Sequence, residues 1–314
     1  MTDVLVTPPE QDGFVPIDGP MPQPSVEGKI FSASRVVTWM DCALQAHFKY
    51  DLRVQTPQNA AATFGTVLHL AMQHYNDTGD GAGALDIFKT NWQFPDRIGL
   101  DPGYYPNGTS WNSYNELGQA VVEDALKDAV WTPKDVIGTE VPFLVPIGRY
   151  WLRGRIDLLD LAKSGKGVQT LRAVDYKSKY KPPTKAELAL DVQFTIYLWA
   201  IQQIEFWCGV PGEPEYAGLG PVDGPKMYEQ IMELPHRGIW YHLRTQKEID
   251  AGPRVGADFE RLYRVLCEID RADELQVHVP RIGDACALCD FRTECPMEIP
   301  ADLALDEDDE NAWI

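Results

Sequence analysis

The stretch from Arg149 to Lys177 reads RYWLRGRIDLLDLAKSGKGVQTLRAVDYK and decides the fold class. Its two ends are rich in branched and aromatic residues, which is typical of β-strands, and the polar segment around Gly165 suits a connection between them. We therefore predict a hairpin with strands over 149–161 and 168–177. A turn near Gly165 would place Asp157 roughly opposite residue 173, one diagonal step from Asp175 on the same face of the sheet.

Asp157, Asp175 and Lys177 form the first candidate site. Residues two apart on a strand share a face, so the side chains of Asp175 and Lys177 are expected to point the same way. Two carboxylates that meet there repel each other unless a cation lies between them, and Mg²⁺ or Mn²⁺ prefers such oxygen ligands. With a lysine to orient water, the set suits metal-assisted phosphodiester hydrolysis. From spacing alone, ordinary surface ion pairs remain the alternative.

Helical periodicity is expected on both sides of this hairpin. Apolar residues recur at helical spacing in five stretches, which are 34–50, 60–75, 115–130, 191–207 and 258–271. Strand character is predicted over 136–144 and 229–244, and a long irregular insertion over 77–110. This order predicts an α/β fold, a short mixed sheet flanked by helices.

The composition indicates an ordinary globular protein. The chain has 314 residues, of which 44% are hydrophobic and 24% charged. It contains no apolar run near the roughly 18 residues of a membrane span, and its start lacks a secretory-signal pattern, so we expect a soluble, cytoplasmic protein without a membrane partner. Residues 1–30 are expected to be a disordered proline-rich arm, 31–300 a single domain and 301–314 an acidic disordered tail.

The formal net charge of −19 argues at first against nucleic acid as a partner. However, the two ends of the chain hold much of it, with −4 in residues 1–30 and −6 in residues 301–314. The run from Arg172 to Lys185 has a local charge of +4 and interleaves Tyr176 and Tyr180, so it is a candidate strand-binding surface. A solvated end of the hairpin is the alternative.

Further motifs surround the hairpin in a fixed order. They are Ser32-Ala33-Ser34-Arg35 followed by Cys42, then Gly65-Thr66-Val67-Leu68-His69, Gly154-Arg155-Ile156-Asp157, Asp175-Tyr176-Lys177, Gln193-Phe194-Thr195-Ile196-Tyr197, and Cys286, Cys289 and Cys295. In this order, from about residue 31 to 296, the chain resembles a RecB-type nuclease of the PD-(D/E)XK superfamily. Its layout is similar to that of the CRISPR-associated and phage-encoded iron–sulfur exonucleases.

The resemblance implies a PD-(D/E)XK core and a metal-dependent deoxyribonuclease, an exonuclease on DNA ends or single strands that acts in recombination, replication or repair. It implies Mg²⁺ or Mn²⁺ held by His69, Asp157, Asp175 and the backbone carbonyl of Tyr176. Lys177 would be the catalytic lysine.

Gln193 and Tyr197 share a helix face, and the resemblance gives them a part in binding DNA near the scissile phosphate. Glu140, which lies in the strand before Asp157, is a further candidate for the metal side. The alternative is that Glu140 is an exposed strand glutamate without a role, which is the more common case.

The six cysteines indicate a second metal site. Cys286, Cys289 and Cys295 are close in sequence, and Cys42 is the expected distant fourth ligand, whereas Cys208 and Cys267 follow apolar helix positions and are expected in the core. Four thiolates suit Zn²⁺ or an iron–sulfur cluster equally by count. The resemblance implies a [4Fe–4S] cluster.

Two other functions fit the same sequence. One is a non-catalytic DNA-binding or assembly subunit that keeps the nuclease fold, and the other is a nuclease that processes CRISPR spacers. The acidic tail, which ends in Trp313-Ile314, could dock on a partner protein or mimic DNA, with a merely solvated tail as the alternative.

Overall fold

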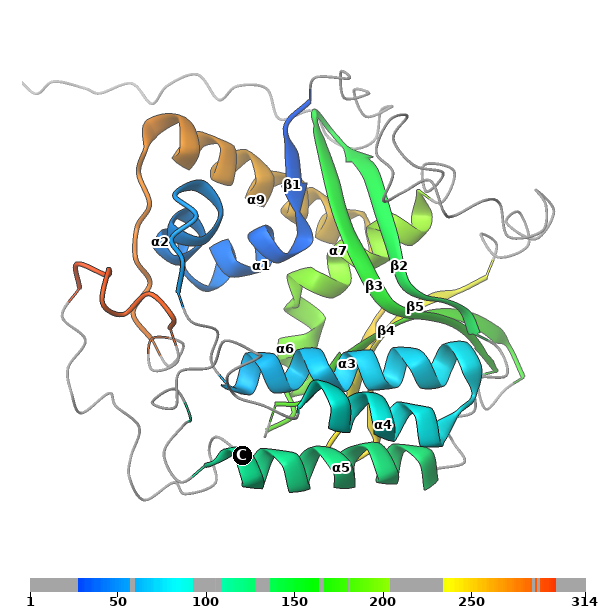
Figure 1. Cartoon of the computed structure of the whole chain (residues 1–314). Coiled ribbons are helices and arrows are strands. Elements are labelled where there is room, and N and C mark those ends of the chain that lie inside the picture. Colours follow the sequence, from blue (N-terminus) through cyan, green and yellow to red (C-terminus); the bar gives the residue numbers. More distant parts are fainter. Residues whose placement is uncertain are drawn as a thin grey trace, which may run out of the picture.

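The computed structural model in Figure 1 describes most of the chain between residues 28 and 297. The described residues are 28–56, 60–92, 105, 109–127, 136–163, 167–179, 181–203, 234–283, 286 and 289–297. The predicted tail over 301–314 lies outside this part, as does the predicted arm up to residue 27. Lys29 already belongs to the folded part, because its ammonium pairs with Asp270 at 2.8 Å and with Asp273 at 2.7 Å.

Six strands form one mixed sheet. They are β1 (Ile30–Ser32), β2 (Val136–Ile147), β3 (Tyr150–Lys163), β4 (Gln169–Lys177), β5 (His236–His242) and β6 (Lys247–Gly252). β1 is parallel to β3 and β5 is parallel to β4, while the other neighbours are antiparallel. The mixed sheet is confirmed, but β1 and β6 were not predicted as strands. A strand of three residues carries too little periodicity to be recognised from sequence.

The two edges of β3 have different partners. β2 covers one edge over residues 150–160. On the other edge, β1 pairs with residues 151–153 and β4 with residues 158–163. Between them, residues 154–157 have no strand partner on this edge within the described part of the sheet. The Gly154-Arg155-Ile156-Asp157 motif therefore lies at an interruption between β1 and β4.

The register of the β3–β4 hairpin differs from the prediction by two residues. Leu159 pairs with Ala173, the residue that had been expected opposite Asp157. The last pair is Leu158 with Val174, so this register brings Asp157, just beyond the paired residues, level with Asp175. A polar connection with several small residues does not fix its own centre, so the register is set by packing of the two strands.

Three helices pack on one face of the sheet, as Figure 1 shows: α1 (Ala33–Asp41), α7 (Val192–Gln202) and α9 (Gly256–Leu275). Side chains cap two of them. The Ser32 hydroxyl accepts from the Arg35 N–H at 3.1 Å, and the Asp191 carboxylate accepts from the Phe194 N–H at 3.1 Å. The predicted helices over 191–207 and 258–271 are confirmed where they are described. A short helix with a Thr184–Glu187 capping box, α6 (Lys185–Leu190), precedes α7.

The other face carries α3 (Ala60–Thr78), α4 (Gly81–Asn91) and α5 (Trp111–Lys127). The predicted helices over 60–75 and 115–130 are confirmed with small shifts of their ends. The predicted irregular insertion over 77–110 is wrong where α4 lies. Its N-cap is Asp80, whose carboxylate accepts from the Gly83 N–H at 3.0 Å. Two glycines in its first turn lower the helix propensity of α4 and conceal it in the sequence.

The predicted continuous helix over 34–50 is broken at Cys42. This residue is extended, with φ −160° and ψ 118°, and separates α1 from α2 (Ala43–Ala46), which continues into a one-turn π-helix, η1 (His47–Asp51). Apolar periodicity does not reveal one extended residue between two helical segments. None of the described helices is both long and apolar enough to cross a membrane.

Candidate active site

Asp175 lies near the end of β4 and is 1% exposed. Lys177 Nζ lies 2.7 Å from its Oδ2, and Gln193 Nε2 donates to its Oδ1 at 2.9 Å. The Gln193 side chain also accepts from Lys177 Nζ at 3.2 Å and donates to the Tyr197 hydroxyl at 2.8 Å. One amide on α7 thus joins the acid, the lysine and the tyrosine.

Asp157 and His69 approach this group from β3 and α3. The Asp157 carboxylate accepts from the Tyr176 N–H at 2.9 Å, and its Oδ2 lies 3.5 Å from His69 Nδ1. His69 Nε2 lies 2.8 Å from the Tyr176 carbonyl oxygen. Asn76, seven residues beyond His69 on the same helix, donates to the Tyr176 hydroxyl at 2.6 Å, which fixes α3 against β4. The predicted set of His69, Asp157 and the Tyr176 carbonyl is therefore brought together.

Glu140 belongs to the same group. Its carboxylate, a nitrogen of His69 and the carboxylate of Asp157 each offer a ligand atom within 4.8 Å of the other two. Glu140 has φ +46°, in the left-handed region that non-glycine residues rarely occupy. Such backbone strain is concentrated at functional sites. The sequence signal for Glu140 is its place in the strand before Asp157. Val141 pairs with Ile156, and this pairing places Glu140 beside Asp157.

Burial controls the electrostatics of this site. It raises the pKa of Asp157, of Asp175 and of Glu140 above the ordinary range for a carboxyl group. Burial alone would lower the pKa of Lys177, but the carboxylates of Asp175 and Asp157 outweigh it and raise that pKa. In their ionised form the three carboxylates would be balanced only in part by the Lys177 ammonium and by the Arg155 guanidinium near Glu140, which leaves an excess of negative charge.

This donor set fits a hard divalent cation. Carboxylates, a backbone carbonyl and an imidazole are ligands that Mg²⁺ and Mn²⁺ accept, and a divalent charge would balance the excess of carboxylates. In an octahedron with bonds of about 2.1 Å, neighbouring ligand atoms are about 3.0 Å apart. The 2.8 Å between His69 Nε2 and the Tyr176 oxygen agrees with that spacing.

The four predicted cysteines line one pocket. Cys42, Cys286, Cys289 and Cys295 meet there, together with apolar side chains that include Phe48 and Phe291. Burial raises the pKa of the Cys289 thiol, and the nearby Cys42 and Cys286 add to this. The segment after α9 returns to α2, as Figure 1 shows, and residues of both line the pocket. Cys267 lies on α9 and is partly buried against the core, as predicted, and Cys208 is outside the described residues.

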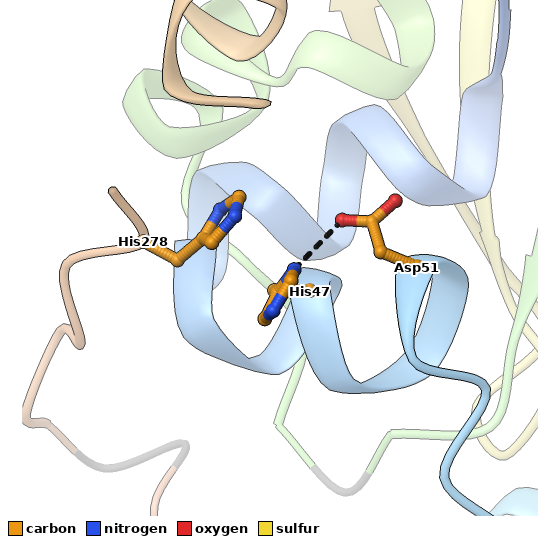
Figure 2. Close-up of side chains that lie close together, drawn as sticks. All are labelled: His47, Asp51 and His278. Carbon is orange, nitrogen blue, oxygen red and sulfur yellow. Dashed lines mark hydrogen bonds and ion pairs between the residues drawn. The ribbon is translucent and has the colours of Figure 1, made fainter. Parts of the chain in front are cut away.

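Three side chains beside this pocket form a second group that could hold a metal, as Figure 2 shows. His47 Nδ1 lies 3.0 Å from Asp51 Oδ2, and the rings of His47 and His278 stack with centroids 3.8 Å apart. Burial and the neighbouring His47 lower the pKa of His278. The other Asp51 oxygen pairs with Arg35 at 2.8 Å. These contacts tie η1 to the segment after α9. In the sequence, only the four-residue spacing of His47 and Asp51 indicates that members of this group lie close together.

The predicted basic surface over Arg172–Lys185 is changed by the structure. Arg172 is partly buried and pairs with Asp160 and Glu248, and Lys177 pairs with Asp175. These two residues are therefore not available as free surface cations. Lys179, Lys181 and Lys185 remain exposed.

Comparison with known proteins places the chain in a family. The sequence model of the PD-(D/E)XK nuclease superfamily matches residues 30–296. A search of curated proteins gave no significant match. One similar solved structure, described as "Crystal structure of SSO0001", is 15% identical over 87% of this chain and 88% of that chain, with a TM-score of 0.35.

Proposed function

The chain belongs to the PD-(D/E)XK nuclease superfamily, and from this we propose that it is a metal-dependent deoxyribonuclease. The observation that carries the proposal is the meeting of Asp157, Asp175 and Lys177 at the interruption between β1 and β4. Two buried carboxylates and a partly buried ammonium are costly to place together without a ligand that uses them. A phosphodiester with a divalent cation is such a ligand.

Each side chain has a role in this proposal. Lys177 orients the attacking water and stabilises negative charge that develops on the phosphate. Gln193 is a positioning residue, since it holds both Lys177 Nζ and Asp175 Oδ1. The pKa of Tyr197 is raised by burial, so its hydroxyl stays protonated and can donate to Asp175, 3.4 Å away.

His69, Asp157, Asp175 and the Tyr176 carbonyl would hold Mg²⁺ or Mn²⁺, with Glu140 as a further ligand. The cation supplies Lewis acidity toward the phosphate and a water of lowered pKa. The protein residues supply the fixed arrangement, because α3, β2, β3 and β4 each contribute to the set. Removal of any one element would therefore disturb the donor geometry.

Finer parts of the proposal rest on the resemblance of the sequence to RecB-type nucleases. We assign the enzyme an exonuclease activity on DNA ends or single strands, in recombination, replication or repair, as in the phage-encoded relatives that the sequence resembles. We also assign a [4Fe–4S] cluster to Cys42, Cys286, Cys289 and Cys295, which line one pocket. Its role would be structural, because hydrolysis needs no electron transfer.

The direct test is a cleavage assay with end-labelled single- and double-stranded DNA in Mg²⁺, in Mn²⁺ and in EDTA. We expect cleavage with either metal and none in EDTA, with products that shorten from an end. Binding without cleavage under every metal condition would favour a non-catalytic DNA-binding subunit. Cleavage only at the junctions of CRISPR spacer precursors would favour spacer processing.

A further inference from the structure

A groove opens beside the candidate active site, between β3 and the segment that contains α1 and η1. Its volume is about 470 Å³. It is lined by Ser32, Ala33, Ser34, Val37, Thr38, Lys49, Tyr50, Arg153, Gly154, Arg155, Gln193 and Tyr197. Gln193 and Tyr197 form one wall, and both contact Asp175. The groove is therefore continuous with the site assigned above.

The lining is positively charged in a strongly acidic protein. Lys49, Arg153 and Arg155 line the groove, and no aspartate or glutamate does. All three are exposed, and none makes an ion pair with another described residue. By contrast, Arg172 and Arg237 each pair with a carboxylate. Arg155 also has a favourable charge interaction with Glu140 of the candidate metal site. Cations without an ion-pair partner among the described residues, gathered in one groove of a chain with a net charge of −19, indicate an anionic ligand.

Arg153 and Arg155 follow one another along β3 in the direction of the active site. Arg153 and Arg155 are exposed on β3 and alternate with the buried Leu152 and Ile156. From Arg153 to Asp157 the strand advances by about 13 Å. The two arginines are about 6.6 Å apart along the strand, comparable to the separation of successive phosphates in an extended nucleic-acid strand. The arginines thus form a short row that ends at a carboxylate of the candidate metal site.

The opposite wall adds further donors and an aromatic ring. α1 begins here and its first turn contains no acidic residue; the Ser32 hydroxyl already accepts from the Arg35 N–H, which leaves the first N–H groups of the helix other than that of Arg35 without partners within the helix. Ser34 is exposed at this end. Lys49 Nζ lies 5.6 Å from the centre of the Tyr50 ring, so η1 contributes both a cation and a ring on which a base can stack.

We propose that this groove binds a single DNA strand next to the scissile phosphate, with Arg153, Arg155 and Lys49 on consecutive backbone phosphates. This rests on the proposed nuclease function. Arg153 and Arg155 lie in one row along a single β-strand, which suits the backbone of one DNA strand. The surface differs from the predicted basic run over Arg172–Lys185. Binding in this groove places the DNA strand between the metal site and the helix segment that follows Cys42.

The test measures binding of a fluorescein-labelled oligothymidine strand by anisotropy over a series of salt concentrations. EDTA is present, so that binding is measured without cleavage. The test variant is Arg153→Ala/Arg155→Ala, and the matched control is Lys163→Ala/Arg261→Ala. The control removes the same charge from the far end of β3 and from the surface of α9. Melting curves check that both variants are folded.

Each lost phosphate contact lowers the slope of log affinity against log salt by about 0.7 for single strands. We therefore expect the groove variant to lose about 1.4 in this slope and at least about tenfold in affinity, and the control to remain within about twofold of the unmodified protein. Equal affinity and slope in the groove variant, with intact cleavage by the unmodified protein, would overturn the groove and leave the nuclease standing. Loss of blunt-duplex binding to the same extent would overturn the single-strand assignment. A protein that binds through the groove but never cleaves would instead refute the nuclease function.

Discussion

Lys177 Nζ lies 2.7 Å from Asp175 Oδ2. The two residues are two positions apart on one strand, so their side chains share a face. Gln193 bridges them from α7 by contacting both side chains. Asp157 comes from the neighbouring strand and makes no such contact with Lys177. It accepts from the Tyr176 N–H and faces His69 instead. The two acids therefore have different partners, and the divalent cation of the proposed mechanism would join them.

The Gln193 amide should matter through the residues it positions. In Gln193→Ala, Lys177 and Asp175 lose the group that fixes their relative geometry, and we expect the apparent affinity for Mn²⁺ in the cleavage reaction to fall about 10- to 100-fold. The rate at saturating metal should fall less. The matched control is Gln202→Ala at the other end of the same helix. A metal dependence equal to that of the unmodified protein would contradict the positioning role.

The cysteine pocket should hold iron. Cys286→Ala and Cys289→Ala are expected to lose bound metal, solubility and DNA binding together, because the site ties α2 and η1 to the segment after α9. Cys267→Ala, on α9, is the control and should retain all three. Protein purified without oxygen should be brown and contain about four irons per chain. Colourless protein with stoichiometric zinc after anaerobic reconstitution would replace the cluster with a zinc site.

The network around Asp270 should make stability depend on pH. Burial alone would raise the pKa of this carboxyl, but Lys29 and the Tyr150 hydroxyl, with Arg149 nearby, lower it overall. A lowered pKa in the folded state means that the carboxylate stabilises the fold at neutral pH. The stabilisation is lost as the pH falls below the ordinary value of 3.8 and through the folded-state pKa.

We therefore expect Asp270→Asn to lower the melting temperature at pH 7 by a few degrees, with a difference that shrinks below about pH 4. Glu274→Gln, an exposed change on the same helix, is the control and should have little effect at either pH. A deficit of Asp270→Asn that grew on acidification would contradict the assigned direction of the pKa shift.

Gly118 on α5 should resist substitution because of its packing. A Cβ at this position would collide with the Phe88 ring of α4, which is fully buried. Gly118→Ala is expected to destabilise the protein by about 1–3 kcal/mol in denaturant unfolding. Gly256→Ala on α9 is the control, because a Cβ there meets nothing within 4 Å. The control should be neutral or stabilising by up to about 1 kcal/mol. Equal effects of the two substitutions would refute the close packing of α4 on α5.

Short motifs in the sequence proposed site residues that the structure brings together, whereas parts of the sheet around them were not predicted. Asp157, Asp175 and Lys177 were proposed because strand alternation fixes which side chains share a face, whereas His69 was proposed from the resemblance of its motif to the family. The register of the hairpin was two residues off, because a small polar connection such as the one near Gly165 does not determine its own centre. That error left the common face intact, since a shift of two residues preserves the alternation.

Other features depend on tertiary packing and gave little signal. Glu140 was held only as a further candidate, because its left-handed backbone is visible only once β2 lies beside β3. Arg172 appeared as a free surface cation until the structure paired it with Asp160 of β3 and Glu248 of β6. The groove over Arg153 and Arg155 requires the gap between β1 and β4, and no local pattern encodes that gap.

The central claim is that Lys177, together with Asp157 and Asp175, cleaves DNA. The most direct measurement is the single-turnover rate of cleavage of an end-labelled single strand in Mn²⁺, for the unmodified protein and for Lys177→Ala, Lys177→Arg and Asp157→Asn. Because these groups act as a unit, we predict a loss of at least about 10³ in rate for Lys177→Ala and Asp157→Asn, in protein that still binds the strand in EDTA and melts cooperatively. Lys177→Arg keeps the charge with a different shape and should fall in between. Cleavage by folded Lys177→Ala at the rate of the unmodified protein would contradict the account.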